Sequence, residues 1–129
     1  MAQAALVANV AGLNIRTCEV HLWGSGTNGA LQLVDSELAS CRNKFGVPWT
    51  ITSVECWANA GTNTAVWLQV TGGANSTILS GALTCGNGSW TSGTLNGTPA
   101  LLSNDTVDIN VTAADASTTN IRVVVSGTI

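Results

Sequence analysis

The sequence predicts an all-β protein, an antiparallel β-sandwich of jelly-roll type with seven to nine short strands. Apolar and polar residues alternate along several short segments, as they do in strands with one buried face. Glycine and asparagine turns separate those segments. Only residues 35–41 (DSELASC) have helical character, and we expect one or two turns of helix there, capped by Asp35 or Ser36.

The chain is organised around residues 49–71, WTITSVECWANAGTNTAVWLQVT, which are predicted to form a β-hairpin with its loop at 59–63. The returning strand places Val66, Leu68 and Val70 on one face. On the outgoing strand, Ile51 and Val54 fall on opposite faces. That strand is therefore either buried on both sides or shifted in phase by a β-bulge.

Further strands are predicted on both sides of this hairpin. They cover residues 16–23, 76–83, 105–112 and 119–126, with a short strand or the start of a connection at 30–34. Gly81 is expected to be a bulge or twist point within its strand. Residues 85–98 contain two Asn-Gly pairs and should form a long ordered loop, held in place by Trp90 and Leu95.

The domain organisation is simple. Residues 15–129 are predicted to form a single β-sandwich domain, a size that allows a real core. Residues 1–14 form an N-terminal arm, either flexible or added as an edge strand, because their first twelve residues lack periodicity. This segment is apolar but has no basic region, so it is not a convincing secretion signal.

The composition is unusually poor in charge. Charged residues make up 9% of the 129, and hydrophobic residues 45%, whereas about 25% charged is ordinary. A surface rich in Thr, Ser, Asn and Gly fits a protein packed in an assembly or located outside a cell. The net charge is −3 and the four cations are scattered, so nucleic-acid binding is not expected. No apolar run reaches the ~18 residues that membrane insertion requires.

Four cysteines, Cys18, Cys41, Cys56 and Cys85, allow three disulfide pairings. No Cys-x-x-Cys pair occurs and His21 is the only histidine, so the spacing does not fit a zinc site. The cysteines are either disulfide-bonded or small buried hydrophobic residues. Our preferred pairing is Cys56–Cys85 with Cys18–Cys41, since Cys56 lies in the first central strand and Cys85 just after the third.

No residue pattern predicts catalysis. Nucleophilic catalysis needs a positioned base, and the lone His21, with Glu19 on the same strand face, is expected to be a surface or interface residue. Carboxylate pairs for glycoside cleavage exist only formally, among Asp35, Glu37, Glu55, Asp105, Asp108 and Asp115. Asp105 and Asp115 suit turns, Asp108 suits an outward strand position, and no dense Asp/Asn loop indicates calcium. We predict no enzymatic activity, no metal and no cofactor.

The tryptophans are more informative, since the chain has five of them, one phenylalanine and no tyrosine. Several fall on strand faces that point away from the apolar one, as does one valine of the last strand. Outward tryptophans can be buried by a neighbouring subunit or can stack on sugar rings; alternatively, the second face belongs to the core. The candidate interface or glycan-binding residues are Trp23, Trp57, Trp67, Trp90 and Val124.

Residues 43–129 carry a family likeness. The segments concerned are TITSVECWANAG, AVWLQV, STILSGALTC and PALLSNDTVDINVTAADASTTNIRVVVSG. Together they resemble the small jelly-roll modules of bacteriophage and prophage virion proteins, such as tail-fibre receptor-binding tips and accessory head or tail proteins. That family usually has Gly-Asp before its penultimate strand, where this chain has Asn104-Asp105. Residues 1–42 show no match to it.

The resemblance implies a non-enzymatic structural protein located in a virion, as a head decoration or a tail-fibre component. Such a protein would assemble symmetrically, most simply as a homotrimer, and would contact other virion proteins. Two alternatives remain open. One is a carbohydrate-binding module that holds a cell-surface glycan on exposed tryptophans, and the other is a subunit of an open extracellular filament.

Overall fold

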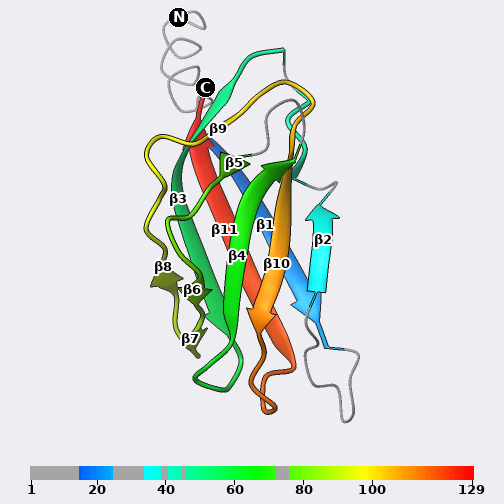
Figure 1. Cartoon of the computed structure of the whole chain (residues 1–129), viewed down its shortest axis with the longest axis vertical. Coiled ribbons are helices and arrows are strands. Elements are labelled where there is room, and N and C mark those ends of the chain that lie inside the picture. Colours follow the sequence, from blue (N-terminus) through cyan, green and yellow to red (C-terminus); the bar gives the residue numbers. More distant parts are fainter. Residues whose placement is uncertain (1–14, 25–33, 39–40, 45, 72–75) are drawn as a thin grey trace, which may run out of the picture.

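The structure is a computed structural model of the chain, and it describes residues 15–24, 34–38, 41–44, 46–71 and 76–129. Within these residues, two β-sheets pack face to face and no α-helix is present, which confirms the predicted all-β sandwich (Figure 1). The predicted arm, residues 1–14, lies outside the described residues, as does most of the segment predicted at 30–34.

We call the six-stranded layer sheet A and the five-stranded layer sheet B. Sheet A has the order β1 (Ile15–Trp23), β11 (Asn120–Thr128), β3 (Trp49–Ala58) and β7 (Gly86–Asn87), with β8 (Thr91–Ser92) and β9 (Ala100–Leu101) also paired to β3. Sheet B has the order β2 (Val34–Leu38), β10 (Thr106–Ala113), β4 (Ala65–Thr71) and β5 (Ser76–Thr77), with β6 (Leu83–Thr84) also paired to β4.

The strands are divided between the two sheets so that neighbours in the sequence often lie in opposite layers. β1, β3 and β11 belong to sheet A, whereas β2, β4 and β10 belong to sheet B. Every ladder is antiparallel except the short one between β3 and β7. This order is that of a jelly roll. If β5 and β6 are taken as one interrupted strand and β8 and β9 as another, the described sandwich has nine strands, within the predicted range.

The predicted hairpin at 49–71 is wrong in its pairing, although both strands and the loop lie where expected. β3 lies in sheet A and β4 in sheet B, so residues 59–64 cross from one layer to the other (Figure 1). Both strands bury one face against the same core. The alternation of apolar and polar residues shows which face is buried, but it does not show which strand is the hydrogen-bonded neighbour. Gly61 makes the crossing possible with a φ of 88°, since a side chain there would overlap Asp115 and Thr118.

The predicted helix at 35–41 is also wrong, because residues 34–38 form strand β2. β2 pairs with β10 from Leu38 opposite Val107 to Val34 opposite Val111. A helix of one or two turns satisfies few of its backbone groups, whereas an open sheet edge offers a full ladder of partners. The tertiary pairing therefore overrides the local capping signals.

The predicted strand at 76–83 is interrupted. It is split into β5 and β6, and Gly81 lies exposed in the turn between them rather than at a bulge within one strand. β5 ends at Thr77, and Ser80, within the break, donates its backbone N–H to the carbonyl oxygen of Thr94 at 2.9 Å. Residues 85–98 are ordered as predicted and include β7 and β8. Leu95 packs against the core, but Trp90 is 45% exposed and does not anchor this segment.

The core lies between the sheets and is built from the alternating apolar residues. Those of β4, β10 and β11 are the predicted ones: Val66, Leu68, Val70, Val107, Ile109, Val111, Ile121, Val123 and Val125. On β3 a bulge brings both Ile51 and Val54 into the core, because Ser126 pairs with Ser53 but Gly127 pairs with Ile51. The phase shift predicted for this strand is therefore caused by a β-bulge, which was one of the two alternatives.

Gly127 marks the tightest contact near this bulge. A Cβ atom there would overlap both the Thr50 carbonyl oxygen and the indole nitrogen of Trp49. Trp49 itself is buried, so this tryptophan, which is not one of the interface or glycan-binding candidates, is a core residue.

Two disulfides cross-link the sandwich, in the pairing preferred from the sequence. Cys18 of β1 joins Cys41, with 5.5 Å between their Cα atoms, and Cys56 of β3 joins Cys85, with 4.8 Å. All four residues are buried. Each disulfide joins a long strand of sheet A to a segment that connects two strands. The disulfides therefore fix these connecting segments to sheet A.

At one end of the sandwich, the loop 59–64, between β3 and β4, binds the loop 114–119, between β10 and β11. The Asp115 backbone N–H donates to Thr64 Oγ1 (3.0 Å), Thr64 and Thr118 share a hydroxyl hydrogen bond (2.7 Å), and Thr118 Oγ1 donates to the Ala60 carbonyl (2.6 Å). The Asp115 carboxylate accepts hydrogen bonds from Ser117 and from the Thr62 backbone. These bonds, those from Ser117 first, lower the pKa of Asp115 below its ordinary value of 3.8.

Candidate functional site

The outer face of sheet A gathers the chemically distinctive side chains. Neighbouring strands place His21, Arg122 and Trp57 in one row across β1, β11 and β3, with Trp23 opposite Asn120 beside it. The odd-numbered positions of β1 and the even-numbered positions of β11 point outward because the intervening residues are buried in the core. We call this surface the tryptophan face. It comprises Glu19, His21, Trp23, Glu55, Trp57, Asn120, Arg122 and Val124.

Direct contacts hold the aromatic side chains of this face together. The rings of His21 and Trp23 lie 4.5 Å apart between centroids, at an interplanar angle of 33°. The Arg122 guanidinium carbon lies 5.3 Å from the Trp57 ring centroid, within range of a cation–π interaction. His21 Nε2 and Asn120 Oδ1 share a hydrogen bond of 3.2 Å. Trp23 and Trp57 are therefore held by polar neighbours on a flat β-surface.

The two tryptophans differ in exposure. Trp23 is 69% exposed at the end of edge strand β1, whereas Trp57 is half-buried on β3, one strand in from the described edge pieces. Val124 is also half-buried, and register places it between Glu19 and Glu55. The face thus combines a freely accessible aromatic ring, an apolar centre and carboxylate, guanidinium and imidazole groups.

The structure brings only some of the predicted candidates together. Trp23, Trp57 and Val124 share the tryptophan face. Trp67 lies on the outer face of sheet B, opposite Asn110, and is half-buried against the edge of the core. Trp90 lies in the turn between β7 and β8. The candidates therefore belong to three different surfaces.

Sequence reasoning did not single out Arg122 and Asn120 as members of this face. Both follow the outward positions of the last strand, so their direction was predictable. Their role depends on β11 lying between β1 and β3, and that strand order is not visible in the alternation of a single strand.

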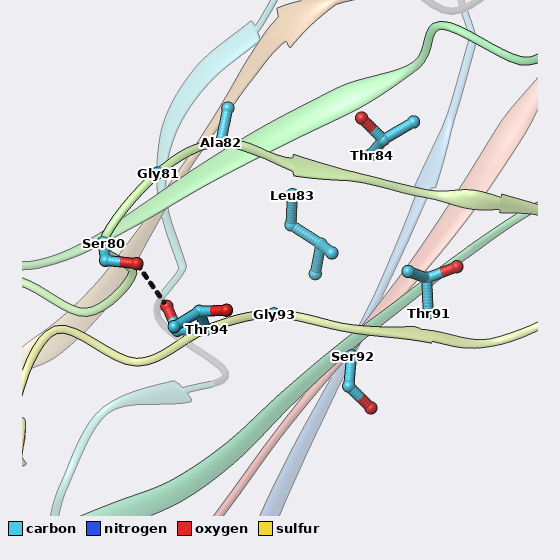
Figure 2. Close-up of a pocket in the computed structure, with 9 residues that line it drawn as sticks. All are labelled: Ser80, Gly81, Ala82, Leu83, Thr84, Thr91, Ser92, Gly93 and Thr94. Carbon is cyan, nitrogen blue, oxygen red and sulfur yellow. Dashed lines mark hydrogen bonds between the residues drawn. The ribbon is translucent and has the colours of Figure 1, made fainter.

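A second surface feature is a hollow of about 220 Å³ between the β5–β6 connection and the segment that contains β8. Figure 2 shows residues 80–84 and 91–94 facing each other, with the Leu83 side chain pointing into the space between them. A hydrogen bond from Ser80 Oγ to the Thr94 carbonyl (3.3 Å) closes one end. The hollow is lined by hydroxyl groups, glycine backbone and one leucine. Among the described residues of its lining, none could act as a base toward those hydroxyls.

In the part of the chain that the structure describes, no three His, Cys, Asp or Glu residues cluster as metal ligands would. No helix among those residues is long and apolar enough to cross a bilayer.

Comparisons of the sequence with protein-family models and curated proteins, and of the structure with solved structures, found no match.

Proposed function

We propose that this protein is a non-enzymatic structural module of a phage virion, a head decoration or tail-fibre component, that acts by symmetric assembly and surface adhesion. The observation that carries the proposal is the tryptophan face. Interfaces between proteins are enriched in tryptophan and arginine, and their binding energy concentrates at such residues. Here both residue types lie together on one flat sheet surface.

The interior of this face suits burial against another subunit. Trp57 and Val124 are half-buried and still expose apolar surface, and a partner that removes this surface from water gains hydrophobic free energy. The whole chain has only four cations and seven acids, but three of these residues, Glu19, Glu55 and Arg122, lie on the tryptophan face, so a partner must pair them when it covers this face. The jelly-roll order and the resemblance of residues 43–129 support the location in a virion, and a homotrimer is the favoured assembly.

The test is the solution mass, measured by light scattering without reductant, of the native chain and a matched pair of variants. Val124→Lys places a charge on the centre strand of sheet A, and Asn110→Lys places the same charge on the corresponding strand of sheet B. We expect a trimer that Val124→Lys weakens about 100-fold, an effect of about 2.7 kcal/mol, and that Asn110→Lys leaves intact. A native monomer contradicts symmetric assembly, and open-ended polymers indicate a filament subunit.

One observation favours a second function, a carbohydrate-binding module. Trp23 is 69% exposed, and a sugar ring could stack on it within reach of the His21 imidazole and the Asn120 amide beside it. Trp23→Ala should then abolish glycan binding without changing the solution mass. Trp90→Ala, which truncates an exposed tryptophan away from this face, is the matched control.

A further inference from the structure

A pocket near the start of β1 is separate from the tryptophan face. It has a volume of about 150 Å³ and lies between the first residues of β1 and the segment 41–43. The Cys18–Cys41 disulfide joins these two walls. Its lining consists of Arg16, Thr17, Cys18, Cys41, Arg42, Asn43 and Trp49.

The described lining of this pocket carries positive charge, whereas the net charge of the protein is negative. The chain has a net charge of −3 and only four lysines and arginines, yet two of them, Arg16 and Arg42, line this one pocket. Lys44 follows two residues after Arg42 and is exposed. Among the described residues of this lining, two carry positive charge and none is a carboxylate. The described lining is therefore more positive than the protein as a whole.

One described carboxylate, that of Asp105, belongs to a residue bonded to this lining. Its backbone carbonyl accepts a hydrogen bond from the Asn43 backbone N–H, which places Asp105 behind the pocket wall. The Asp105 side chain is buried and accepts a hydrogen bond from the Leu102 backbone N–H. Arg42, in turn, donates to Asn104 Oδ1 at 3.3 Å, an exposed and long bond that a ligand could replace.

A buried donor in the same lining points independently to a ligand. Trp49 is 6% exposed, and its indole nitrogen is buried without a hydrogen-bond partner. A buried N–H without an acceptor costs about 1–3 kcal/mol, so this group favours an acceptor that enters the pocket. The indole nitrogen lies against Gly127, the residue that pairs with Arg16 in the β1–β11 ladder. The indole donor therefore lies beside the residue that pairs with Arg16.

We propose that this pocket binds a small oxyanion, a carboxylate or a phosphate group, between Arg16 and Arg42 and in reach of the Trp49 indole N–H. Guanidinium groups bind both kinds of anion through paired N–H donors, and an indole contributes one further donor and no acceptor. The volume suits a single such group and excludes a folded partner or an oligosaccharide chain. The site does not depend on the proposed virion function.

The test is nuclear magnetic resonance of the full, oxidised chain labelled with ¹⁵N, followed at the five indole N–H resonances. Sodium phosphate and sodium acetate are added in separate titrations up to about 100 mM, a range that captures weak millimolar binding. Sodium chloride keeps the ionic strength constant, because unspecific charge effects are screened equally in all samples.

We expect a saturable shift of the Trp49 resonance with at least one oxyanion, and the stronger of the two identifies the preferred group. Arg42→Gln should weaken this binding about tenfold or more, and Arg122→Gln, which removes an arginine from the tryptophan face, should not change it. Because Arg42 is exposed, its variant should fold normally. The proposal is overturned if neither oxyanion shifts Trp49, if chloride alone produces the same shift, or if Arg42→Gln binds as the native chain does.

Discussion

The two disulfides allow a quantitative prediction of how much cross-linking contributes to the free energy of unfolding. They close loops with sequence separations of 23 and 29 residues. In the chain-entropy description, a cross-link of that size destabilises the unfolded chain by about 3.5 kcal/mol at room temperature. A domain of this kind has a total free energy of unfolding of about 5–15 kcal/mol. We therefore expect Cys56→Ala/Cys85→Ala and Cys18→Ala/Cys41→Ala each to remove a large part of the stability.

The assay is urea denaturation followed by tryptophan fluorescence, with the oxidised native chain as the reference. With a slope of about 1–3 kcal/mol per molar urea, each double variant should shift the midpoint down by about 1 M or more. The loss should be slightly larger for the Cys56–Cys85 pair, because Cys56 is fully buried and its truncation leaves a small cavity. Unchanged midpoints in both variants would refute the reasoning and would mean that the layers hold without cross-links.

Three further predictions follow from single positions. Gly127→Ala should lower the free energy of unfolding by about 3 kcal/mol or more in urea denaturation, because its Cβ overlaps neighbouring atoms, whereas Gly81→Ala, with open space around it, should change it by about 0.5 kcal/mol at most. Asn104 has a φ of 71°, so Asn104→Ala should cost about 1 kcal/mol more than Asn104→Gly in the same assay; equal losses would contradict the backbone explanation. Asp115 has a lowered pKa in the folded protein. Its carboxylate therefore contributes fully to the stability of the fold above the ordinary pKa of 3.8, and this contribution is lost as the pH falls through the lower pKa of the folded state. Native chain and Asp115→Asn should therefore differ most near neutral pH and converge in acid, as thermal unfolding at several pH values would reveal.

Much of the fold was predictable from the sequence because alternation reports burial directly. The buried faces of β4, β10 and β11 are those that the pattern indicated. Strand partners were not predictable in the same way. The hairpin at 49–71 was wrong because a short Gly-containing loop can turn a chain within one sheet or carry it to the opposite one. The helix at 35–41 was wrong because the ladder with β10 outweighs weak local preference.

The candidate site was predictable only in its parts. The outward direction of Trp23, Trp57 and Val124 followed from alternation, and all three lie on sheet A as outward residues. Their grouping with Arg122 required the strand order, which one sequence does not contain. The Asn104-Asp105 turn shows the opposite case, since a turn was expected there and Asn104 has the positive φ that asparagine tolerates in turns.

The position of β11 has a consequence for how the protein comes into being. The last strand of the chain lies between β1 and β3, which have no ladder with each other. During synthesis, sheet A therefore cannot close until the final strand has left the ribosome, and until then β1 and β3 present unpaired edges. Such late, non-local closure slows folding and exposes the nascent chain to aggregation. Loss of residues 120–128 should accordingly prevent the whole sandwich from forming, rather than shorten it by one strand.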